Sequence, residues 1–259
     1  MTDALFALDG DGFLPTELSQ GPWDPNALHG GAPAALMARA IESVDPGAGM
    51  FVTRMTVEFL RPVPRAHLVV STTLVRPGKK VQLVDASIEA GGVEVARATA
   101  LRIRQAPMEL PDYPRPEEET PAFPDEVIDI SGGIRSGMGS AMEIRTVRGH
   151  FATPGPAAAW MRLRYPVVEG EQPSPLMRVM GAADFGNGLS GVLDYFKYIY
   201  INPDLTVYLH RHPVGEWVCL DAATEASPNG VGVAESRLWD CDGPIGRSLQ
   251  ALLIDQRPT

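Results

Sequence analysis

Apolar and polar positions along the chain first follow the spacing of a helix and then that of strands. Between Gly30 and Val44 the apolar residues recur every three or four positions, which predicts an amphipathic helix with one core-facing stripe. The stripe consists of Leu36, Met37, Ala40, Ile41 and Val44, and Pro46 and Gly47 end the helix. The pattern then changes to the alternation of strands over 51–63, 67–76, 81–90 and 93–104.

A second, similar run of elements follows. Strands are predicted over 144–151 and 157–166, and Ser174-Pro175 supplies an N-cap and a first-turn proline for a helix. The apolar stripe of this helix consists of Leu176, Val179, Met180 and Ala183. Further strands are predicted over 198–210, 216–226, 231–240 and 246–254. Each half is therefore a helix with an antiparallel meander, which is an α+β arrangement.

Two short matches indicate an internal repeat. Thr56-Val-Glu-Phe-Leu-Arg-Pro62 is similar to Thr206-Val-Tyr-Leu-His-Arg-His-Pro213, and Gly92-Val-Glu-Val-Ala96 is similar to Gly230-Val-Gly-Val-Ala234. Between about 106 and 126 the chain is rich in Pro and Glu, which is typical of an exposed connection. The sequence therefore predicts two units, 1–105 and 143–259, joined by a linker over 106–142.

The composition is that of a folded protein with a sizeable core, since 44% of the 259 residues are hydrophobic and 21% are charged. The formal net charge of −10 argues against a nucleic-acid partner, because phosphates need a basic face. No uncharged apolar run reaches the roughly 18 residues of a membrane span, and the start lacks the basic region of a signal peptide. We therefore expect a cytoplasmic protein without a membrane partner, in which Cys219 and Cys241 are unpaired.

One carboxylate falls where the pattern predicts core. Asp184 lies on the stripe of the second helix, four positions after Met180 and next to Ala183. Burying it unpaired would cost several kcal/mol, so it must be hydrogen-bonded, protonated or in contact with a wet pocket. Partial desolvation would suit this carboxylate to act as a general base for water. The alternative is an ordinary exposed Asp at the end of a helix.

Three further positions are candidates for a site. Gln250 lies in an apolar strand, where a buried amide needs partners. It forms hydrogen bonds either to a carboxylate and a water or to a neighbouring loop. Asn202 precedes Pro203 and by itself is typical of a turn or a strand start. His29-Gly30-Gly31 introduces the first helix, where free N–H groups can stabilise an oxyanion; tight helix packing is the alternative. No metal is predicted, because His210 and His212 lack a third ligand at metal spacing.

Several stretches together resemble the acyl-CoA thioesterase II (TesB-like) family over nearly the whole chain. They are Leu28-His-Gly-Gly-Ala-Pro-Ala-Ala-Leu-Met37, Phe59-Leu-Arg-Pro62, Asp204-Leu-Thr-Val-Tyr-Leu-His-Arg211, Gly215-Glu-Trp-Val218 and Ser248-Leu-Gln-Ala-Leu-Leu253. The resemblance implies a double hotdog, two tandem units each with a long helix wrapped by an antiparallel β-sheet. It also implies an acyl-CoA hydrolase of fatty acid metabolism that needs no cofactor.

The resemblance implies site residues as well. In that family a carboxylate on the second-half helix, a hydroxyl residue on the next strand and a glutamine on the last strand orient the attacking water. These catalytic positions correspond to Asp184, Asn202 and Gln250, with an amide in place of the hydroxyl. A histidine before Phe-Leu-Arg-Pro is replaced by a threonine in this chain. Substrate contacts are expected from His29, Gly30, Gly31 and Thr56. Arg61 and Lys79-Lys80 are candidates for contacts to the phosphates of coenzyme A, and the alternative is a solvated, charged hairpin tip.

The first half is expected to lack a second competent site, because the counterparts of Asp184 and Gln250 fall near Gly30 and Thr99. Hotdog sheets commonly associate through their edges, so a homodimer or a higher homo-oligomer is expected. Two alternatives to hydrolysis remain open. One is a hotdog acyl-CoA hydratase or dehydratase, for which His29 is the one histidine near a helix start, and the other is a non-catalytic acyl-CoA-binding protein.

Overall fold

The computed structural model describes residues 3–45, 49–114, 119–124 and 136–257. The strands of the first half are β1 (Phe6–Asp9), β2 (Gly12–Pro15), β3 (Met50–Phe59), β4 (Leu68–Arg76), β5 (Val81–Ala90) and β6 (Val93–Arg104). Those of the second half are β7 (Met142–His150), β8 (Thr153–Leu163), β9 (Tyr198–Ile201), β10 (Asp204–Leu209), β11 (Val218–Ser227), β12 (Val231–Asp240) and β13 (Gly243–Gln256). The helices are η1 (Glu17–Ser19), α1 (Gly31–Glu42), α2 (Met138–Ala141), α3 (Pro175–Ala183) and α4 (Gly186–Leu189).

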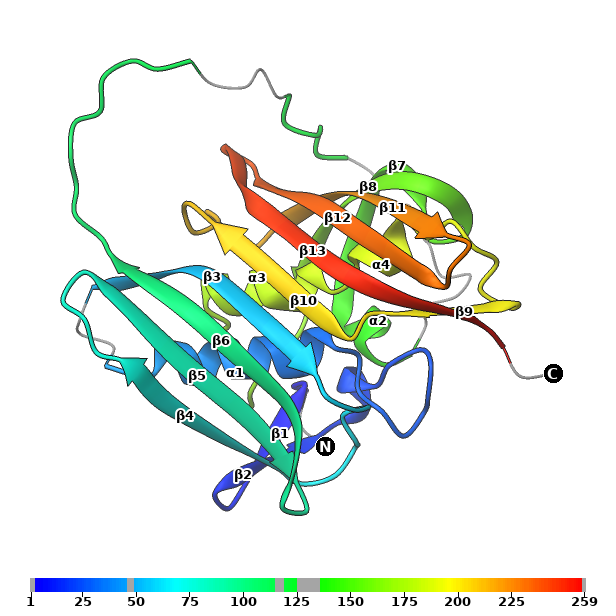
Figure 1. The fold of residues 1–259 in the computed structure, drawn as a ribbon, viewed down its shortest axis with the longest axis horizontal. Helices are drawn as coiled ribbons and strands as arrows, with labels where there is room; N and C mark the ends of the chain where they lie inside the picture. Colours follow the sequence, from blue (N-terminus) through cyan, green and yellow to red (C-terminus); the bar gives the residue numbers. More distant parts are fainter. Residues whose placement is uncertain (1–2, 46–48, 115–118, 125–135, 258–259) are drawn as a thin grey trace.

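All the strands belong to one antiparallel sheet that curls around α1 and α3 (Figure 1). Their order is β1-β2-β4-β5-β6-β3-β10-β13-β12-β11-β8-β7, and β9 pairs with β13. The two halves meet where β3 lies beside β10, with Thr56 directly opposite Thr206. At the other end of the sheet the N–H of Phe6 donates to the carbonyl of Val167 at 2.9 Å, so the first strand also touches the second half. A mostly antiparallel sheet with few helices agrees with the predicted α+β hotdog class.

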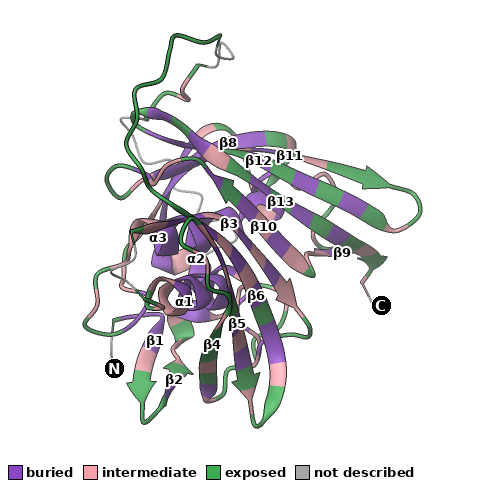
Figure 2. Ribbon diagram, turned by 60° about the vertical axis from the view of Figure 1, so that its left-hand side comes forward, coloured by how far each residue is buried: buried purple, intermediate pink, exposed green. Residues whose placement is uncertain are grey.

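The two long helices lie antiparallel inside the sheet and are largely buried (Figure 2). An added Cβ at Gly31 would lie 2.6 Å from the carbonyl oxygen of Gly181, so only glycine permits this approach of α1 to α3. Because α3 covers the side of α1 that faces away from the sheet, α1 is buried on all sides from Gly31 to Ala38. The prediction of a single core-facing stripe on this helix was therefore wrong. The start of α3 is as predicted, since Ser174 Oγ accepts from the N–H of Met177 at 3.1 Å.

Each helix ends with a carboxylate against the start of the other helix. Asp184 caps the end of α3 and lies against Gly30, while Glu42 ends α1 and accepts from Ser174 Oγ at 2.5 Å. A local two-fold relation between the halves therefore makes Glu42 the counterpart of Asp184, which corrects the expectation of a position near Gly30. Burial raises the pKa of Glu42, and the Ser174 hydroxyl partly offsets this.

The strand order also corrects part of the repeat. The match of Thr56 with Thr206 relates β3 to β10 and agrees with the two-fold relation. The match of Gly92 with Gly230 is wrong, because it relates β6 to β12, whereas the last strand of the second half is β13. Ala90 pairs with Val93 in one hairpin and Asp240 pairs with Gly243 in the other, so the counterpart of Gly92 is the turn residue Asp242.

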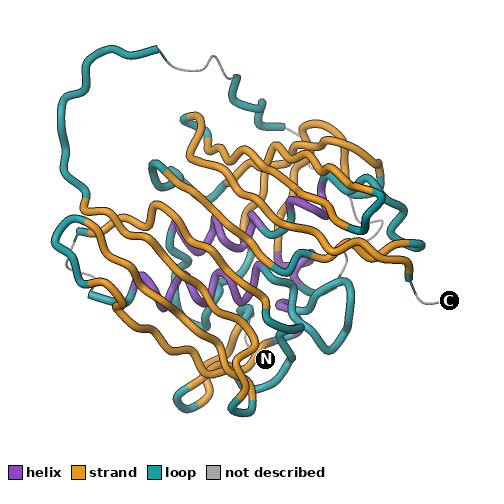
Figure 3. Tube along the Cα trace, viewed as in Figure 1, coloured by secondary structure: helices purple, strands orange, loops and turns teal. Residues whose placement is uncertain are grey.

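Local differences from the predicted elements have simple causes. The expected strand over 198–210 is split into β9 and β10, because Pro203 has no N–H for the ladder. A hairpin of β1 and β2 precedes α1, and β7 and β8 take the same place before α3, so each half has a hairpin, a helix and further strands. Residues 106–114 are exposed and contain neither helix nor strand, as the linker prediction requires (Figure 3). The predicted helix end at Pro46 and Gly47 lies outside the described residues, and the unit boundaries at 105 and 143 stay predictions.

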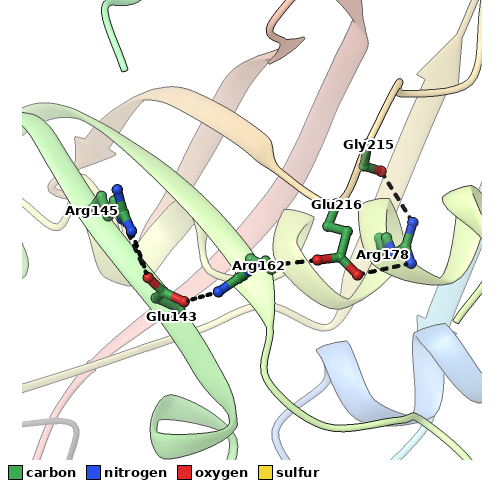
Figure 4. Close-up of polar contacts among 6 residues, drawn as sticks. All are labelled: Glu143, Arg145, Arg162, Arg178, Gly215 and Glu216. Atoms are coloured by element: carbon green, nitrogen blue, oxygen red, sulfur yellow. Dashed lines mark hydrogen bonds and ion pairs between the residues drawn. The ribbon is translucent and has the colours of Figure 1, made fainter. Parts of the chain in front are cut away.

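A chain of alternating charges holds α3 to the sheet (Figure 4). Glu143 on β7 accepts from Arg162 at 2.5 Å, Arg162 lies 3.3 Å from Glu216, and Glu216 lies 3.4 Å from Arg178 on α3. Burial favours the neutral form of Glu143, but its bonds to Arg162 and Arg145 outweigh this and lower its pKa below the ordinary value. The chain of charges therefore links α3 to β7 and β8.

Candidate active site

A cavity of about 310 Å³ opens where the two halves meet. The first half contributes the loop 21–30 and the end of β3 with its following turn, and the second half contributes the end of α3 and the break between β9 and β10. Asp184 lies in its wall together with His29, Gly30 and Asn202. The structure thus brings together four of the residues that the sequence singled out.

Asp184 is buried and surrounded by donors from three segments. Its side chain is only 4% exposed, which excludes the alternative of an ordinary solvated Asp at a helix end. Its Oδ1 accepts from Asn202 Nδ2 at 2.8 Å and from Gln250 Nε2 at 3.3 Å, and its Oδ2 lies 3.0 Å from His29 Nδ1. These partners satisfy the desolvated carboxylate and fix its orientation.

Asn202 holds the carboxylate from the break between β9 and β10. Its Nδ2 donates to Asp184 Oδ1 and to the carbonyl of Asp204 at 3.0 Å, so both amide hydrogens are used. Pro203 keeps the preceding backbone extended and ends the ladder there, which is why the amide reaches toward α3. Asn202 therefore does more than start a strand, because it joins the strand break to the buried carboxylate.

Gln250 lies behind Asp184 and does not line the cavity. It is 1% exposed on β13, and its Oε1 accepts from the backbone N–H of Asn187 at 3.1 Å. An added Cβ at Gly186 would lie 2.9 Å from this Oε1, so glycine leaves room for the amide. Both functional groups of Gln250 are thus engaged by protein, and the residue fixes Asp184 to the start of α4.

His29 lies between the carboxylate and the start of α1. Its Nδ1 is 3.0 Å from Asp184 Oδ2 and also 3.1 Å from the N–H of Gly31, and the ring stacks on Phe185 with centroids 4.3 Å apart. The side chain is 12% exposed. The sequence predicted a substrate contact for His29 and made it the histidine of the hydratase alternative. It did not predict the contact with Asp184, because that contact joins two distant parts of the chain.

The two glycines after His29 have different roles. Gly31 brings α1 close to α3, and its N–H is directed at His29 Nδ1. Gly30 makes room for the carboxylate, because an added Cβ would lie 2.8 Å from Asp184 Oδ2 and 2.7 Å from Phe59 Cζ. The N–H of Gly30 donates to no residue in the described part of the chain. Of the two N–H groups expected to stabilise an oxyanion, only that of Gly30 is unoccupied.

The structure does not bring Thr56 to this cavity. Its neighbours Met55 and Val57 are buried, so Thr56 points to the opposite face of the sheet, where Thr206 Oγ1 bonds to its Oγ1 at 3.2 Å. Thr56 lines a larger polar hollow of about 410 Å³ on that face. The polar groups of this hollow largely bond one another, as Thr99 does with Asp85 at 2.9 Å. We therefore place the candidate site at the smaller cavity.

Other lining residues were missed or are corrected by the structure. The sequence missed two lining residues, Asn187 and Trp23, and of these only Asn187, a polar residue in a buried stretch, offers a sequence signal. Arg61 lines the cavity as expected for a phosphate contact. The Lys79-Lys80 hairpin lies far from the cavity. The N–H of Arg104 donates to the carbonyl of Lys80, and Arg104 pairs with Met50, the first residue of β3. The cavity lies at the opposite end of β3.

We expect Gly30→Ala to damage the site more than the fold. The added methyl group meets the Asp184 carboxylate and the Phe59 ring, and this overpacking should lower the free energy of unfolding by about 1–3 kcal/mol. A shift of the carboxylate by a few tenths of an ångström should lower kcat/KM on the substrate by at least about 10-fold. Chemical unfolding and steady-state kinetics measure the two effects.

Gly181→Ala on α3 is the matched control. The nearest atom to an added Cβ at this position is 3.7 Å away, and alanine favours a helix over glycine by up to about 1 kcal/mol. Stability should therefore hold or rise and activity should be retained. Equal activity losses in the two variants would contradict the importance of the Gly30 contact.

Comparisons with known proteins agree over most of the chain. Residues 19–103 match the acyl-CoA thioesterase N-terminal domain, and residues 107–254 match the acyl-CoA thioesterase C-terminal domain. No curated protein sequence matches the chain.

Solved structures share the fold at low sequence identity. A hot dog protein of unknown function from Alicyclobacillus acidocaldarius has a TM-score of 0.72 and 19% identity, covering 99% of this chain and 98% of its own. The acyl-CoA thioesterase II TesB2 of Mycobacterium marinum has a TM-score of 0.65 and 14% identity, covering 90% of this chain and 92% of its own. A tesB protein of Mycobacterium avium subspecies paratuberculosis has a TM-score of 0.61 and 17% identity, covering 98% of this chain and 96% of its own. These likenesses show a hotdog fold.

Proposed function

This chain belongs to the acyl-CoA thioesterase family, and on that basis we propose that it hydrolyses acyl-CoA thioesters to the free acid and coenzyme A. The observation that carries the proposal is the buried carboxylate of Asp184, which lies in the wall of a cavity and is held by amides from two other segments. Stability of the fold alone does not explain this carboxylate, because burying a carboxylate without partners costs several kcal/mol.

In the proposed reaction a water molecule attacks the thioester carbonyl carbon. General-base catalysis of this attack depends on the carboxylate of Asp184. The water gives a proton to the base at the Asp184 centre as its oxygen bonds to carbon, the C–S bond then breaks, and the same proton passes to the thiolate of coenzyme A as it leaves. Asn202 orients Asp184 from the side of the cavity, and Gln250 orients it from behind. The amide at 202 thereby replaces the hydroxyl that the family resemblance implies.

The N–H of Gly30 is our candidate donor for the oxyanion that forms on the carbonyl oxygen. Gly30 precedes the first residue of α1, lines the cavity, and lies beside the carboxylate of Asp184. Donors at a helix start are favourable for developing negative charge. Substrate contacts are assigned to His29, Gly30 and Arg61, whereas Thr56 is left out because it faces the other side of the sheet.

The finer statements made from the sequence also belong here as proposals. They are a tandem arrangement of two hotdog units, a place in fatty acid metabolism, a cytoplasmic location, and a homodimer or higher homo-oligomer. Within the described residues no helix has the length and apolar character to cross a membrane.

The proposal is tested by the release of free thiol from a panel of acyl-CoAs with short, long and aromatic acyl groups. We expect turnover on at least one substrate, with free acid and coenzyme A formed in equal amounts. A purified protein that turns over none of them, although ligand binding raises its melting temperature, would contradict hydrolysis and favour a binding protein.

The contact of His29 with Asp184 favours one second candidate, the hydration of a 2-enoyl thioester or the reverse dehydration. A carboxylate and an imidazole side by side can add or remove water across a double bond as well as activate water for hydrolysis. The same panel, extended to a 2-enoyl-CoA, separates the two, because hydration consumes the enoyl absorbance and releases no thiol.

A further inference from the structure

We infer that Nε2 of His29, oriented by Asp184, is the atom that takes the proton from the attacking water. This inference rests on the proposed hydrolysis and assigns its proton acceptor. It also changes the role of His29 from the substrate contact predicted by the sequence to a catalytic residue. Asp184 then becomes the positioning carboxylate of an Asp–His pair.

The first argument is that the oxygens of Asp184 are already engaged. Oδ1 accepts from both Asn202 and Gln250, and Oδ2 faces His29 Nδ1 at 3.0 Å. The carboxylate also packs against Gly30 so closely that no Cβ fits between them. A water that approached Asp184 directly would have to compete with these partners for a side chain that is only 4% exposed.

The second argument is that the imidazole has a free nitrogen. Within the described residues His29 Nε2 has no hydrogen-bond partner, and it is not among the fully buried polar atoms that lack one. The residue lines the cavity, and we assign Nε2 as the ring atom available to a molecule bound there. The stacking of the ring on Phe185 and the bond from the His29 N–H to the carbonyl of Ser19 at 3.0 Å keep the imidazole in place.

The third argument concerns the tautomer. Nδ1 accepts from the Gly31 N–H at 3.1 Å and lies 3.0 Å from Asp184 Oδ2, and a proton placed on Nδ1 would exchange the first contact for a stronger one to an ionised carboxylate. Gly31 gives up that bond at little loss, because the first N–H groups of a helix have no partner within the helix. This tautomer leaves the lone pair on Nε2, which is the state a base requires.

The proton balance follows from this arrangement. An O–H bond of water breaks as its oxygen bonds to the thioester carbon, and the proton passes to Nε2. The C–S bond breaks when the carbonyl re-forms, and the imidazolium returns the same proton to the thiolate sulfur. Asp184 stays ionised throughout and stabilises the imidazolium, as a carboxylate does for the histidine of a catalytic triad.

Chemical rescue tests this inference. His29→Gly removes the ring and leaves a space that opens to the cavity, so we expect kcat on the best acyl-CoA to fall by about 10²–10⁴-fold. Added imidazole should restore activity in a saturable way, and substituted imidazoles that fit should restore it in order of their basicity. Asp184→Asn should lose activity and should not be rescued by imidazole, because this variant lacks the carboxylate and still contains the His29 ring.

His29→Gln supplies a variant that keeps a polar side chain at the site. It should lower kcat strongly and change KM by less than about 3-fold, since the amide can contact substrate but cannot accept a proton. His67→Gln is the matched control, because His67 is 39% exposed and contacts Asp9 at a distance from the cavity. It should keep wild-type activity and should not respond to imidazole.

The outcomes separate the two proposals. Near-normal kcat in His29→Gln, or a loss in folded His29→Gly that no imidazole restores, would overturn the role of His29 while hydrolysis stands. A raised KM with unchanged kcat would return His29 to substrate binding. Wild-type protein that releases no thiol from any acyl-CoA would overturn the proposed function, and the proton-acceptor assignment with it.

Discussion

Asp184→Asn is expected to lower kcat/KM for acyl-CoA by about 10³-fold while the protein remains folded. The substitution keeps the shape and an acceptor oxygen for Asn202 and Gln250, but it removes the negative charge that polarises His29. Thiol release measures the first effect and thermal melting the second. The melting temperature should stay or rise, because a desolvated charge disappears.

Glu42→Gln is the matched control for this experiment. Glu42 occupies the position related to Asp184 by the two-fold relation of the halves, but its carboxylate bonds to Ser174 and does not line the cavity. The same loss of charge should therefore leave kcat/KM within about 3-fold of wild type. If Asp184→Asn retained activity, the carboxylate would not be the centre of the site, even in a thioesterase. If both variants lost activity equally, a general effect of helix-end charge would account for the result.

Asp240→Ala is expected to destabilise the protein by about 3 kcal/mol, the largest effect on folding among the changes considered. The Asp240 side chain is fully buried at the end of β12 and accepts from Arg211 Nη1 at 2.5 Å and Nη2 at 2.6 Å, and from the N–H groups of Val214 and Asp242. Alanine leaves the guanidinium and these N–H groups without their acceptor. Thermal melting should show a drop of roughly 6–12 °C.

The same carboxylate makes stability depend on pH. Burial favours its neutral form, but Arg211 and the two backbone N–H groups outweigh this and lower the pKa of Asp240 below its ordinary value. The stabilisation is thus complete above the ordinary range for Asp and is lost as pH falls through the lowered value. Urea unfolding should show a smaller difference between wild type and Asp240→Ala at pH 2.5 than at pH 7. Asp221→Ala, which breaks an exposed pair with Arg148, should cost at most about 1 kcal/mol at either pH.

Local signals predicted most elements of this fold. Strand alternation and turn residues predicted β5, β6 and β12 with their observed bounds, and Ser174-Pro175 predicted the start of α3. These features depend on neighbours in the sequence. The hairpin of β1 and β2 was missed because its strands are only four residues long, too short for a period to appear. The burial of α1 on all sides depends on α3, which no local pattern of α1 can reveal.

The site was predicted as far as its residues break a pattern. Asp184 and Gln250 are polar residues at apolar positions, and the structure places them in contact. Thr56 was singled out by its place in a motif, yet strand alternation already directs it away from its buried neighbours Met55 and Val57. The pairing of His29 with Asp184 arises from the antiparallel packing of two helices in different halves. Such a contact has no trace in the spacing of residues along one chain.

The two helix-end carboxylates lie in unlike surroundings, and this matters for a chain that carries both junctions. In a symmetric dimer of single units, both junctions between helices are identical, and one sequence must serve at each of them. Joining the units in one chain removes that constraint. One junction in this protein carries an aspartate among amides and an imidazole, and the other carries a glutamate bonded to a serine hydroxyl. A single chain with two junctions therefore lets mutation change one of them without changing the other.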